Sequence, residues 1–310
     1  MRFSLAKTSV VILLLFRITV FCQTDSAKIQ QQRPSPMSET VRKHERIQQK
    51  EFDGVSFEIS GALPKSVEVF VPARSVNKND LDLLIHFLGA SYVVKNAADQ
   101  YKGEVVAAFV HLGAGSKING DAFRDSAVFP RLIDSLRVNT EQRLGHSVHF
   151  KKIILSGWSA GYGAVRQILS TSDNYSRVDA AILLDGIHAS YVPEGITLAE
   201  GGRIDSSHVE AFLRFARDAS LPESRHQFLI VHSEIFPGTY ASTTESTDYI
   251  LQQLGIKRQA VLEWGPLGMQ QISSAGQGHF RVLGFAGNTA PDHVDQFHAL
   301  YYFLNFLAKL

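Results

Sequence analysis

Short apolar runs separated by stretches of helical length make up most of the chain between residues 53 and 310. Runs of roughly four to eight apolar residues are typical of strands buried in a sheet. The first two runs lie close together, as a hairpin requires, whereas the later ones are separated by segments long enough for a helix. The expected strands are Val55–Ser60, Ser66–Pro72, Leu81–Leu88, Val105–Leu112, Lys152–Ser156, Ala180–Leu184, Gln227–His232 and Phe280–Phe285.

Helical stretches connect these runs, among them Ala122–Leu144, Gly163–Ser170 and His293–Ala308. Strands that alternate with helices are typical of a parallel sheet covered on both faces. The pattern therefore predicts an α/β fold, with an eight-stranded, mostly parallel sheet that starts antiparallel and is flanked by helices. The longest interruption, 187–226, holds Gly-rich turns and a helix around Ser207–Ala219. We interpret it as a small cap over the site.

Composition and charge narrow the classes of function. The 310 residues are 45% hydrophobic, which is enough to bury a large core. The formal net charge is +1, from 31 basic and 30 acidic residues that are mixed along the sequence. No surface of a single sign is expected, so a nucleic acid is not an expected partner.

Residues 1–22 have the pattern of a secretory signal peptide. Arg2 and Lys7 supply positive charge, and Val10–Val20 is apolar but too short to span a membrane comfortably. Cleavage after Cys22 would remove the one cysteine and leave a mature chain without a disulfide or a membrane span. A secreted or periplasmic location is therefore expected.

Residues 23–52 are rich in Gln, Ser, Lys and Arg and contain few apolar residues. Such a segment cannot bury enough apolar surface to offset the entropy of ordering, so we expect a disordered leader. The folded domain is expected to span 53–310.

The pentapeptide Gly157-Trp158-Ser159-Ala160-Gly161 follows an apolar strand and precedes a helix. Glycines two positions before and after a serine leave room for the strained turn that exposes its hydroxyl at a helix N-terminus. A strand-to-helix connection packed with small residues is the structural alternative. The strand, turn and helix context favours Ser159 as a nucleophile.

These features resemble the α/β-hydrolase superfamily, in particular its serine esterases and lipases, over residues 53–310. The number of strands, the turn after the fifth strand and the chain order serine, acid, histidine carry the resemblance. It implies hydrolysis of an ester or another acyl compound, without a cofactor. It names no particular substrate, since this fold hosts many chemistries.

The resemblance implies a histidine in the loop after the last strand, and His293 has that place, just after the eighth run. His298 lies further into the final helix and is expected to pack there. His279 precedes the eighth strand, at the wrong end of the sheet. The His293 and His298 pair also lacks the spacing of a zinc-binding helix, so a metal site is not expected.

Two carboxylates end suitable strands and remain alternatives for the acid that orients the histidine. Asp185 follows the sixth strand, and Glu234 follows the seventh. We favour Asp185, because an Asp-Gly pair at a buried strand end must turn sharply into the site and its charge needs a partner. Asp292, adjacent to His293, is a weaker third candidate.

Acyl transfer develops an oxyanion that backbone amides usually stabilise. The amide of Ala160 is one expected donor, and Gly89 and Ala90 after the third strand are expected to supply the other. Leu88 departs from the resemblance, because the superfamily often has a histidine before this glycine. His86 is expected to have a structural role in the strand.

The sequence thus predicts an exported serine hydrolase that cleaves small carboxylic esters through Ser159, His293 and Asp185. A serine peptidase or an acyltransferase could use the same three residues. A non-catalytic binding protein of the same fold is a further alternative, motivated by Leu88. The oligomeric state is left open.

Overall fold

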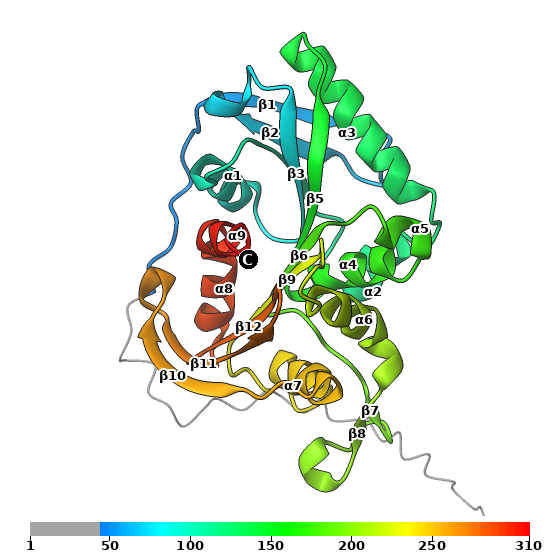
Figure 1. Ribbon diagram of the computed structural model, residues 1–310, viewed down its shortest axis with the longest axis vertical. Helices are drawn as coiled ribbons and strands as arrows, with labels where there is room; N and C mark the ends of the chain where they lie inside the picture. The colour runs from blue at the N-terminus through cyan, green and yellow to red at the C-terminus, as the bar shows by residue number, and fades with distance from the viewer. Residues whose placement is uncertain (1–43) are drawn as a thin grey trace, which may run out of the picture. The chain divides into compact units, whose positions relative to one another are not determined.

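The computed structural model describes residues 44–310, so the predicted signal peptide and residues 23–43 of the predicted leader lie outside it. In the described residues, ten strands form one sheet in the order β1-β2-β4-β3-β5-β6-β9-β12-β11-β10, and β7 and β8 form a separate pair (Figure 1). The strands are β1 (Gly54–Ile59), β2 (Val67–Pro72), β3 (Asp80–Phe87), β4 (Val105–Val110), β5 (His149–Trp158), β6 (Ala180–Leu184), β7 (Tyr191–Val192), β8 (Arg203–Ile204), β9 (Gln227–His232), β10 (Gln259–Trp264), β11 (Gln270–Gln277) and β12 (Phe280–Phe285).

Six neighbouring strands in the middle of the sheet, from β4 to β12 in its spatial order, run parallel. The β1-β2 hairpin is antiparallel and adds to β4 at one edge. Strands β11 and β10 add antiparallel at the other edge. The predicted fold class is therefore confirmed: a mostly parallel α/β sheet with an antiparallel start.

The predicted strand count is wrong, because the large sheet has ten strands rather than eight. All eight predicted runs form strands, and the two that were missed are β10 and β11. Strand β10 is exposed at nearly every position, and β11 has the largely polar sequence QQISSAGQ. A search for apolar runs does not detect such strands, because they are not buried on both faces.

Helices cover both faces of the sheet and bury an apolar cluster on each (Figure 1). Helices α3, α4, α6 and α7 pack on one face, and α1, α8 and α9 on the other. Double coverage explains why every residue of β4 and β6 is buried. The helices are α1 (Ser91–Gln100), α2 (Ser116–Asp121), α3 (Val128–Leu144), α4 (Tyr162–Leu169), α5 (Ser172–Tyr175), α6 (Glu210–Ala219), α7 (Thr243–Leu254), α8 (Ala290–His298) and α9 (Leu300–Leu307).

The predicted cap, 187–226, is longer than the segment that borders the candidate site. Its C-terminal part forms α6, whose Phe212 and Phe215 are fully buried in the core against the sheet. The residues of the segment that line a pocket with Ser159 all lie between 187 and 209. The length was misjudged because an amphipathic helix has the same sequence pattern whether it covers a sheet or a site.

Residues 44–52, which the sequence assigned to the leader, contain no helix or strand but contact α8. The Arg46 guanidinium donates to the carbonyl of Pro291 (2.9 Å), and the Ile47 amide donates to Nδ1 of His298 (3.1 Å). His44 also lies 2.8 Å from a carboxylate oxygen of Asp295. These bonds attach the segment before β1 to the helix that carries His293.

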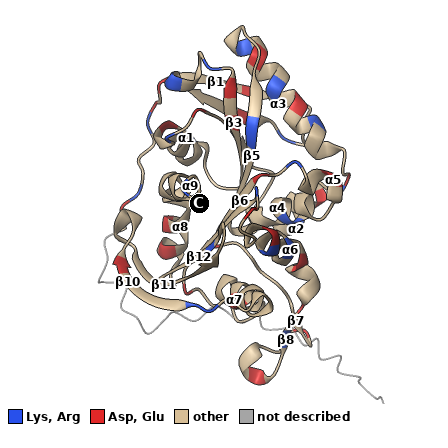
Figure 2. Ribbon diagram, in the orientation of Figure 1, with Lys and Arg blue, Asp and Glu red and all other residues tan. Residues whose placement is uncertain are grey.

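Lys and Arg residues alternate with Asp and Glu residues along the helices and strands of the ribbon (Figure 2). This agrees with the near balance of basic and acidic residues in the sequence. Within residues 44–310, no helix combines the length and the hydropathy that crossing a membrane requires.

Candidate active site

Ser159 lies at the turn between β5 and α4, in the short 3-10 segment Ser159–Gly161. Its φ angle is 49°, in the left-handed region that residues other than glycine rarely adopt. A Cβ on Gly161 would lie 2.2 Å from the carbonyl oxygen of Phe87, and a Cβ on Gly157 would lie 3.0 Å from the Gly161 carbonyl carbon. The predicted strand, turn and helix are therefore present; the turn leaves no room for a side chain at Gly161 and little room at Gly157.

The turn after β6 packs directly against the backbone of the serine. A Cβ on Gly186 would lie 2.4 Å from the carbonyl oxygen of Ser159 and 2.9 Å from its amide nitrogen. Asp185, the residue before it, has a φ angle of 47°, and its amide donates to the carbonyl of Val231 on β9 (2.7 Å). This sharp turn brings the end of β6 next to the serine.

The side chains of Asp185 and His293 are hydrogen-bonded, with 2.8 Å between Oδ2 and Nδ1. Asp185 is almost fully buried, whereas the His293 side chain retains 23% of its exposure. Because a carboxylate only accepts, Nδ1 carries the proton and Nε2 is left as an acceptor. The pair has the tautomer that a general base needs.

Ser233 also holds the carboxylate of Asp185. Its hydroxyl donates to Oδ2 (2.5 Å) and its amide donates to Oδ1 (3.2 Å). Burial raises the pKa of Asp185, but the hydrogen bond and charge of His293 and the two bonds from Ser233 outweigh it and hold this pKa below its ordinary value. The carboxylate therefore stays ionised.

Trp158 fixes the position of His293 from the other side. Its indole Nε1 donates to the backbone carbonyl of His293 (3.0 Å), and the two rings lie 4.9 Å apart between centroids. The indole also stacks on Phe297, one turn further along α8, at 5.2 Å. The residue before the candidate nucleophile thus orients the helix that carries the candidate base, which the sequence pattern did not reveal.

The alternative acids lie elsewhere. The Glu234 carboxylate is 3.7 Å from Nδ1 of His232, and burial raises its pKa. The Asp292 carboxylate accepts from the amide and the hydroxyl of Thr289 and so caps α8. Of the three candidates, the structure brings only Asp185 within hydrogen-bond distance of a ring nitrogen of His293.

The other two histidines considered in the sequence have different contacts. His298 accepts from the Ile47 amide, and burial lowers its pKa to about 4. His279 lies in the turn between β11 and β12, at the opposite end of β12 from His293. The structure thus brings neither ring to Ser159.

The loop after β3 is anchored by a histidine two positions earlier than the resemblance suggested. Nε2 of His86 donates to the carbonyl of Leu88 (2.8 Å), and Nδ1 accepts from the hydroxyl of Ser156 (3.0 Å). His86 is fully buried, and burial lowers its pKa to about 3, so the ring is neutral. Leu88 itself has a φ angle of 70°. The expected structural role of His86 is thus a bond to this loop.

The same loop approaches the serine turn. A Cβ on Gly161 would lie 3.2 Å from Cβ of Leu88. In the described part of the chain, no hydrogen-bond acceptor is recorded for the amides of Gly89, Ala90 or Ala160, whereas the Leu88 amide donates to the carbonyl of Val110 (2.9 Å). The three amides expected to bind an oxyanion therefore remain available.

Two pockets meet at Ser159 and share the side chains of His188 and Tyr240. The smaller pocket has a volume of about 180 Å³ and includes His293 and Asp185. The larger has a volume of about 430 Å³ and includes Ala160 and Arg166 but not His293. The hydroxyl of Ser159 forms no hydrogen bond with another described residue.

His188 is a pocket residue that the sequence reasoning did not identify. Its Nδ1 donates to the carbonyl of Ala241 (3.2 Å), and its ring meets Tyr162 and Tyr240 edge to face at 5.6 and 4.9 Å. Burial lowers its pKa, so the ring is neutral with Nε2 as an acceptor. Its position two residues after Asp185-Gly186, close to the candidate acid, was the one sequence feature that could have indicated a place in the pocket.

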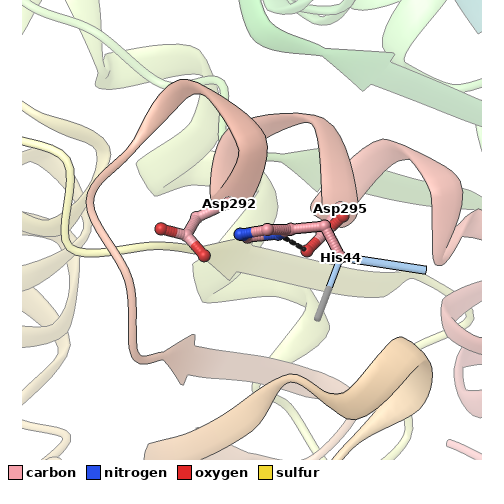
Figure 3. A group of neighbouring side chains, drawn as sticks. All are labelled: His44, Asp292 and Asp295. Carbon is pink, nitrogen blue, oxygen red and sulfur yellow. Dashed lines mark hydrogen bonds and ion pairs between the residues drawn. The ribbon is translucent and has the colours of Figure 1, made fainter. Parts of the chain in front are cut away.

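His44, Asp292 and Asp295 form the one group with metal-ligand geometry found in residues 44–310 (Figure 3). Their ligand atoms all lie within 4.8 Å of one another. Asp295 is already bonded to His44 and paired with Arg46, and Asp292 caps α8. These contacts account for the cluster as an attachment of the segment before β1.

No family model matches this chain, and no curated protein matches it. Among solved structures, an arylesterase is 13% identical with a TM-score of 0.48, over 84% of this chain and 85% of that one. An S-formylglutathione hydrolase from Agrobacterium tumefaciens is 12% identical with a TM-score of 0.48, over 84% and 96%. An acetyl xylan esterase from Aspergillus awamori is 16% identical with a TM-score of 0.42, over 81% and 100%. The fold assignment rests on the strand order described above and not on these distant neighbours.

Proposed function

We propose that this protein is a serine hydrolase that cleaves carboxylic esters through an acyl-enzyme intermediate. The observation that carries the proposal is the hydrogen bond between Asp185 and His293, in a pocket that also contains the strained Ser159. A nucleophile, a base and an orienting acid are the parts that covalent acyl transfer requires.

His293 accepts the proton of the Ser159 hydroxyl at Nε2 as the serine oxygen attacks the ester carbonyl. The imidazolium then donates this proton to the leaving alcohol, and the acyl group remains on the serine. Water attacks the acyl-enzyme with His293 again as the base, and the carboxylic acid leaves. Asp185 stabilises the imidazolium in both halves of the cycle, and its lowered pKa keeps it charged.

The negative charge of each tetrahedral intermediate would be stabilised by backbone amides. Ala160 follows the serine, and the amides of Gly89 and Ala90 lie in the loop that packs against the serine turn. Removing a single such donor costs about 10²- to 10³-fold in kcat in comparable sites. The bond from His86 to the Leu88 carbonyl supports this loop in place of the expected motif histidine.

A panel of one ester, one thioester and one peptide with the same acyl group tests the proposal on purified protein. We expect the ester to give the highest kcat/KM, and Ser159→Ala to reduce this value by at least about 10³-fold. Ser176→Ala, at an exposed serine outside the pockets, is the matched control and should retain activity. A higher kcat/KM for the peptide, or an unaffected Ser159→Ala variant, would contradict the proposal.

We also propose that the protein is exported through a signal peptide that is then removed. The charged start and the apolar stretch Val10–Val20 support a signal peptide over 1–22. The test is the N-terminal sequence of protein recovered outside the cytoplasm, which should begin after Cys22. Full-length protein found only inside the cell would contradict export.

A further inference from the structure

The larger pocket beside Ser159 carries a positive charge and no negative one. Arg166 is the only Lys, Arg, Asp or Glu among its lining residues. Within residues 44–310, no carboxylate lies within ion-pair distance of the Arg166 guanidinium, and no hydrogen-bond acceptor is recorded for it. A guanidinium at the wall of a substrate pocket that forms no ion pair or hydrogen bond with a described residue can bind an anion through its N–H groups.

Arg166 lines the same pocket as the reacting serine. It lies one turn after Tyr162 on α4, and long helical side chains point back toward the helix N-terminus. Its guanidinium carbon lies 5.5 Å from the centroid of the Tyr162 ring, and Tyr162 also lines the pocket. Arg166, Tyr162 and Ser159 therefore line one continuous pocket.

Three residues with hydroxyl groups line the pocket together with Arg166. Ser116, at the start of α2, packs on α4, since a Cβ on Gly163 would lie 2.1 Å from the Ser116 carbonyl oxygen. Ser116, Ser190 and Tyr240 line the pocket, and their hydroxyls form no hydrogen bond with another described residue. Together with Arg166 they offer several donors to the oxygens of one anion.

The residues that line each of the two pockets indicate which part of the substrate lies next to Arg166. The leaving alcohol must lie beside His293, because His293 protonates it, and His293 belongs to the smaller pocket. The larger pocket contains Ala160, one of the proposed oxyanion donors, and extends to Arg166. The acyl group therefore occupies the larger pocket.

Resting on the proposed function, we propose that the substrates are esters whose acyl group ends in a carboxylate, and that Arg166 binds this carboxylate. Arg166 is a specificity-determining residue and takes no part in the proton transfers. The hydrolysis products are then an alcohol and a short dicarboxylic acid.

The kinetic test compares p-nitrophenyl hemiesters of succinic, glutaric and adipic acid with neutral esters in which a methyl ketone replaces the free carboxylate. We expect at least one hemiester to be preferred in kcat/KM over its neutral counterpart. Arg166→Gln should reduce this preference by about 10- to 100-fold, the range for a hydrogen bond to a charged group. Arg166→Lys should retain part of the preference for the hemiester, because the lysine ammonium keeps the positive charge but not the two-pronged hydrogen bonding of arginine.

Arg177→Gln is the matched control, because Arg177 is exposed and lies outside the pocket. It should leave the preference unchanged. A wild-type enzyme that hydrolyses the neutral esters as fast as all three hemiesters would overturn the assignment of Arg166 while the proposed function stands.

A binding test does not depend on turnover. In the Ser159→Ala background, calorimetry compares N-phenylglutaramate, an anionic amide, with its neutral methyl ketone analogue. We expect the anionic amide to bind about 10-fold more tightly or better, with a loss of this difference in the Arg166→Gln double variant and a decrease at high salt. Equal affinities for the two amides would contradict an anion site, whatever reaction the enzyme catalyses.

Discussion

The carboxylate of Asp185 lies 2.8 Å from Nδ1 of His293, although 108 positions separate the two residues in the chain. Asp185 directly follows β6, and His293 lies in α8, which follows β12. Both strands belong to the parallel part of the sheet, so their carboxyl ends meet at one edge, where Ser159 also follows the end of β5. The proposed catalytic residues come together because of this topology.

Asp185→Asn should reduce kcat by about 10⁴-fold, because an amide would fix the wrong tautomer of His293 and would not stabilise its charge. Glu234→Gln is the matched control, since Glu234 contacts His232 instead. The measurement is kcat for a small activated ester at neutral pH. A large loss in Glu234→Gln with a nearly normal Asp185→Asn would exchange the two assignments.

Trp158→Phe should retain the aromatic contact with His293 but lose the bond to its backbone carbonyl. A neutral hydrogen bond contributes about 0.5–1.5 kcal/mol, so we expect kcat to decrease about 3- to 10-fold. Trp264→Phe, at an exposed tryptophan on β10, should have no effect. If both variants keep full activity, Trp158 does not position α8.

Gly186→Ala should impair activity, because its Cβ would lie 2.4 Å from the carbonyl oxygen of Ser159 and would displace the serine turn. Overpacking of this kind typically costs about 1–3 kcal/mol of stability as well. In Gly115→Ala the new Cβ meets Ile118 at 3.7 Å, an ordinary contact. The measurements are the activity and the thermal unfolding temperature of Gly186→Ala and of Gly115→Ala. Equal values for the two variants would contradict the close contact between Gly186 and Ser159.

Stability should decrease as the pH falls from about 6.5 toward 4. Burial lowers the pKa of His86 to about 3, and that of His232 and His298 to about 4, against an ordinary value of 6.5. Between the folded and unfolded pKa values, the unfolded chain binds protons that the folded protein does not. The contribution of these three neutral histidines to the free energy of unfolding is therefore complete above pH 6.5 and is lost as the pH falls below it. Each histidine adds a slope of about 1.4 kcal/mol per pH unit.

Urea unfolding at a series of pH values measures this slope. His86→Gln should reduce it by about 1.4 kcal/mol per pH unit around pH 5, whereas His149→Gln, at an exposed histidine, should not change it. An unchanged slope in His86→Gln would mean that this ring is protonated in the folded protein.

The sequence predicted those parts of the fold that bury apolar residues on both sides. Every parallel strand was found from its apolar run, because helices cover both faces of this part of the sheet; in β4 and β6 every residue is apolar and buried. Strands β10 and β11 were missed, since they lie at an edge with mostly exposed or half-buried residues. The cap was overestimated because burial of Phe212 and Phe215 depends on the packing of α6, which sequence periodicity does not specify.

The candidate site was predictable where a short motif carries its own geometry. The turn at Ser159 is encoded by Gly157 and Gly161, whose close contacts the structure shows. The contributions of Ser233, His188 and Arg166 depend on segments that meet only after folding. Nothing in the local sequence distinguishes such residues from other polar side chains.

The central claim is that Ser159 is an activated nucleophile, and covalent labelling tests it most directly. Folded wild-type protein is treated with a fluorophosphonate and examined by mass spectrometry of the intact chain and of its peptides. We expect one adduct on Ser159, no adduct in Ser159→Ala, and much slower labelling in Asp185→Asn. Folded protein that remains unlabelled, or that carries the adduct on another serine, would contradict the claim.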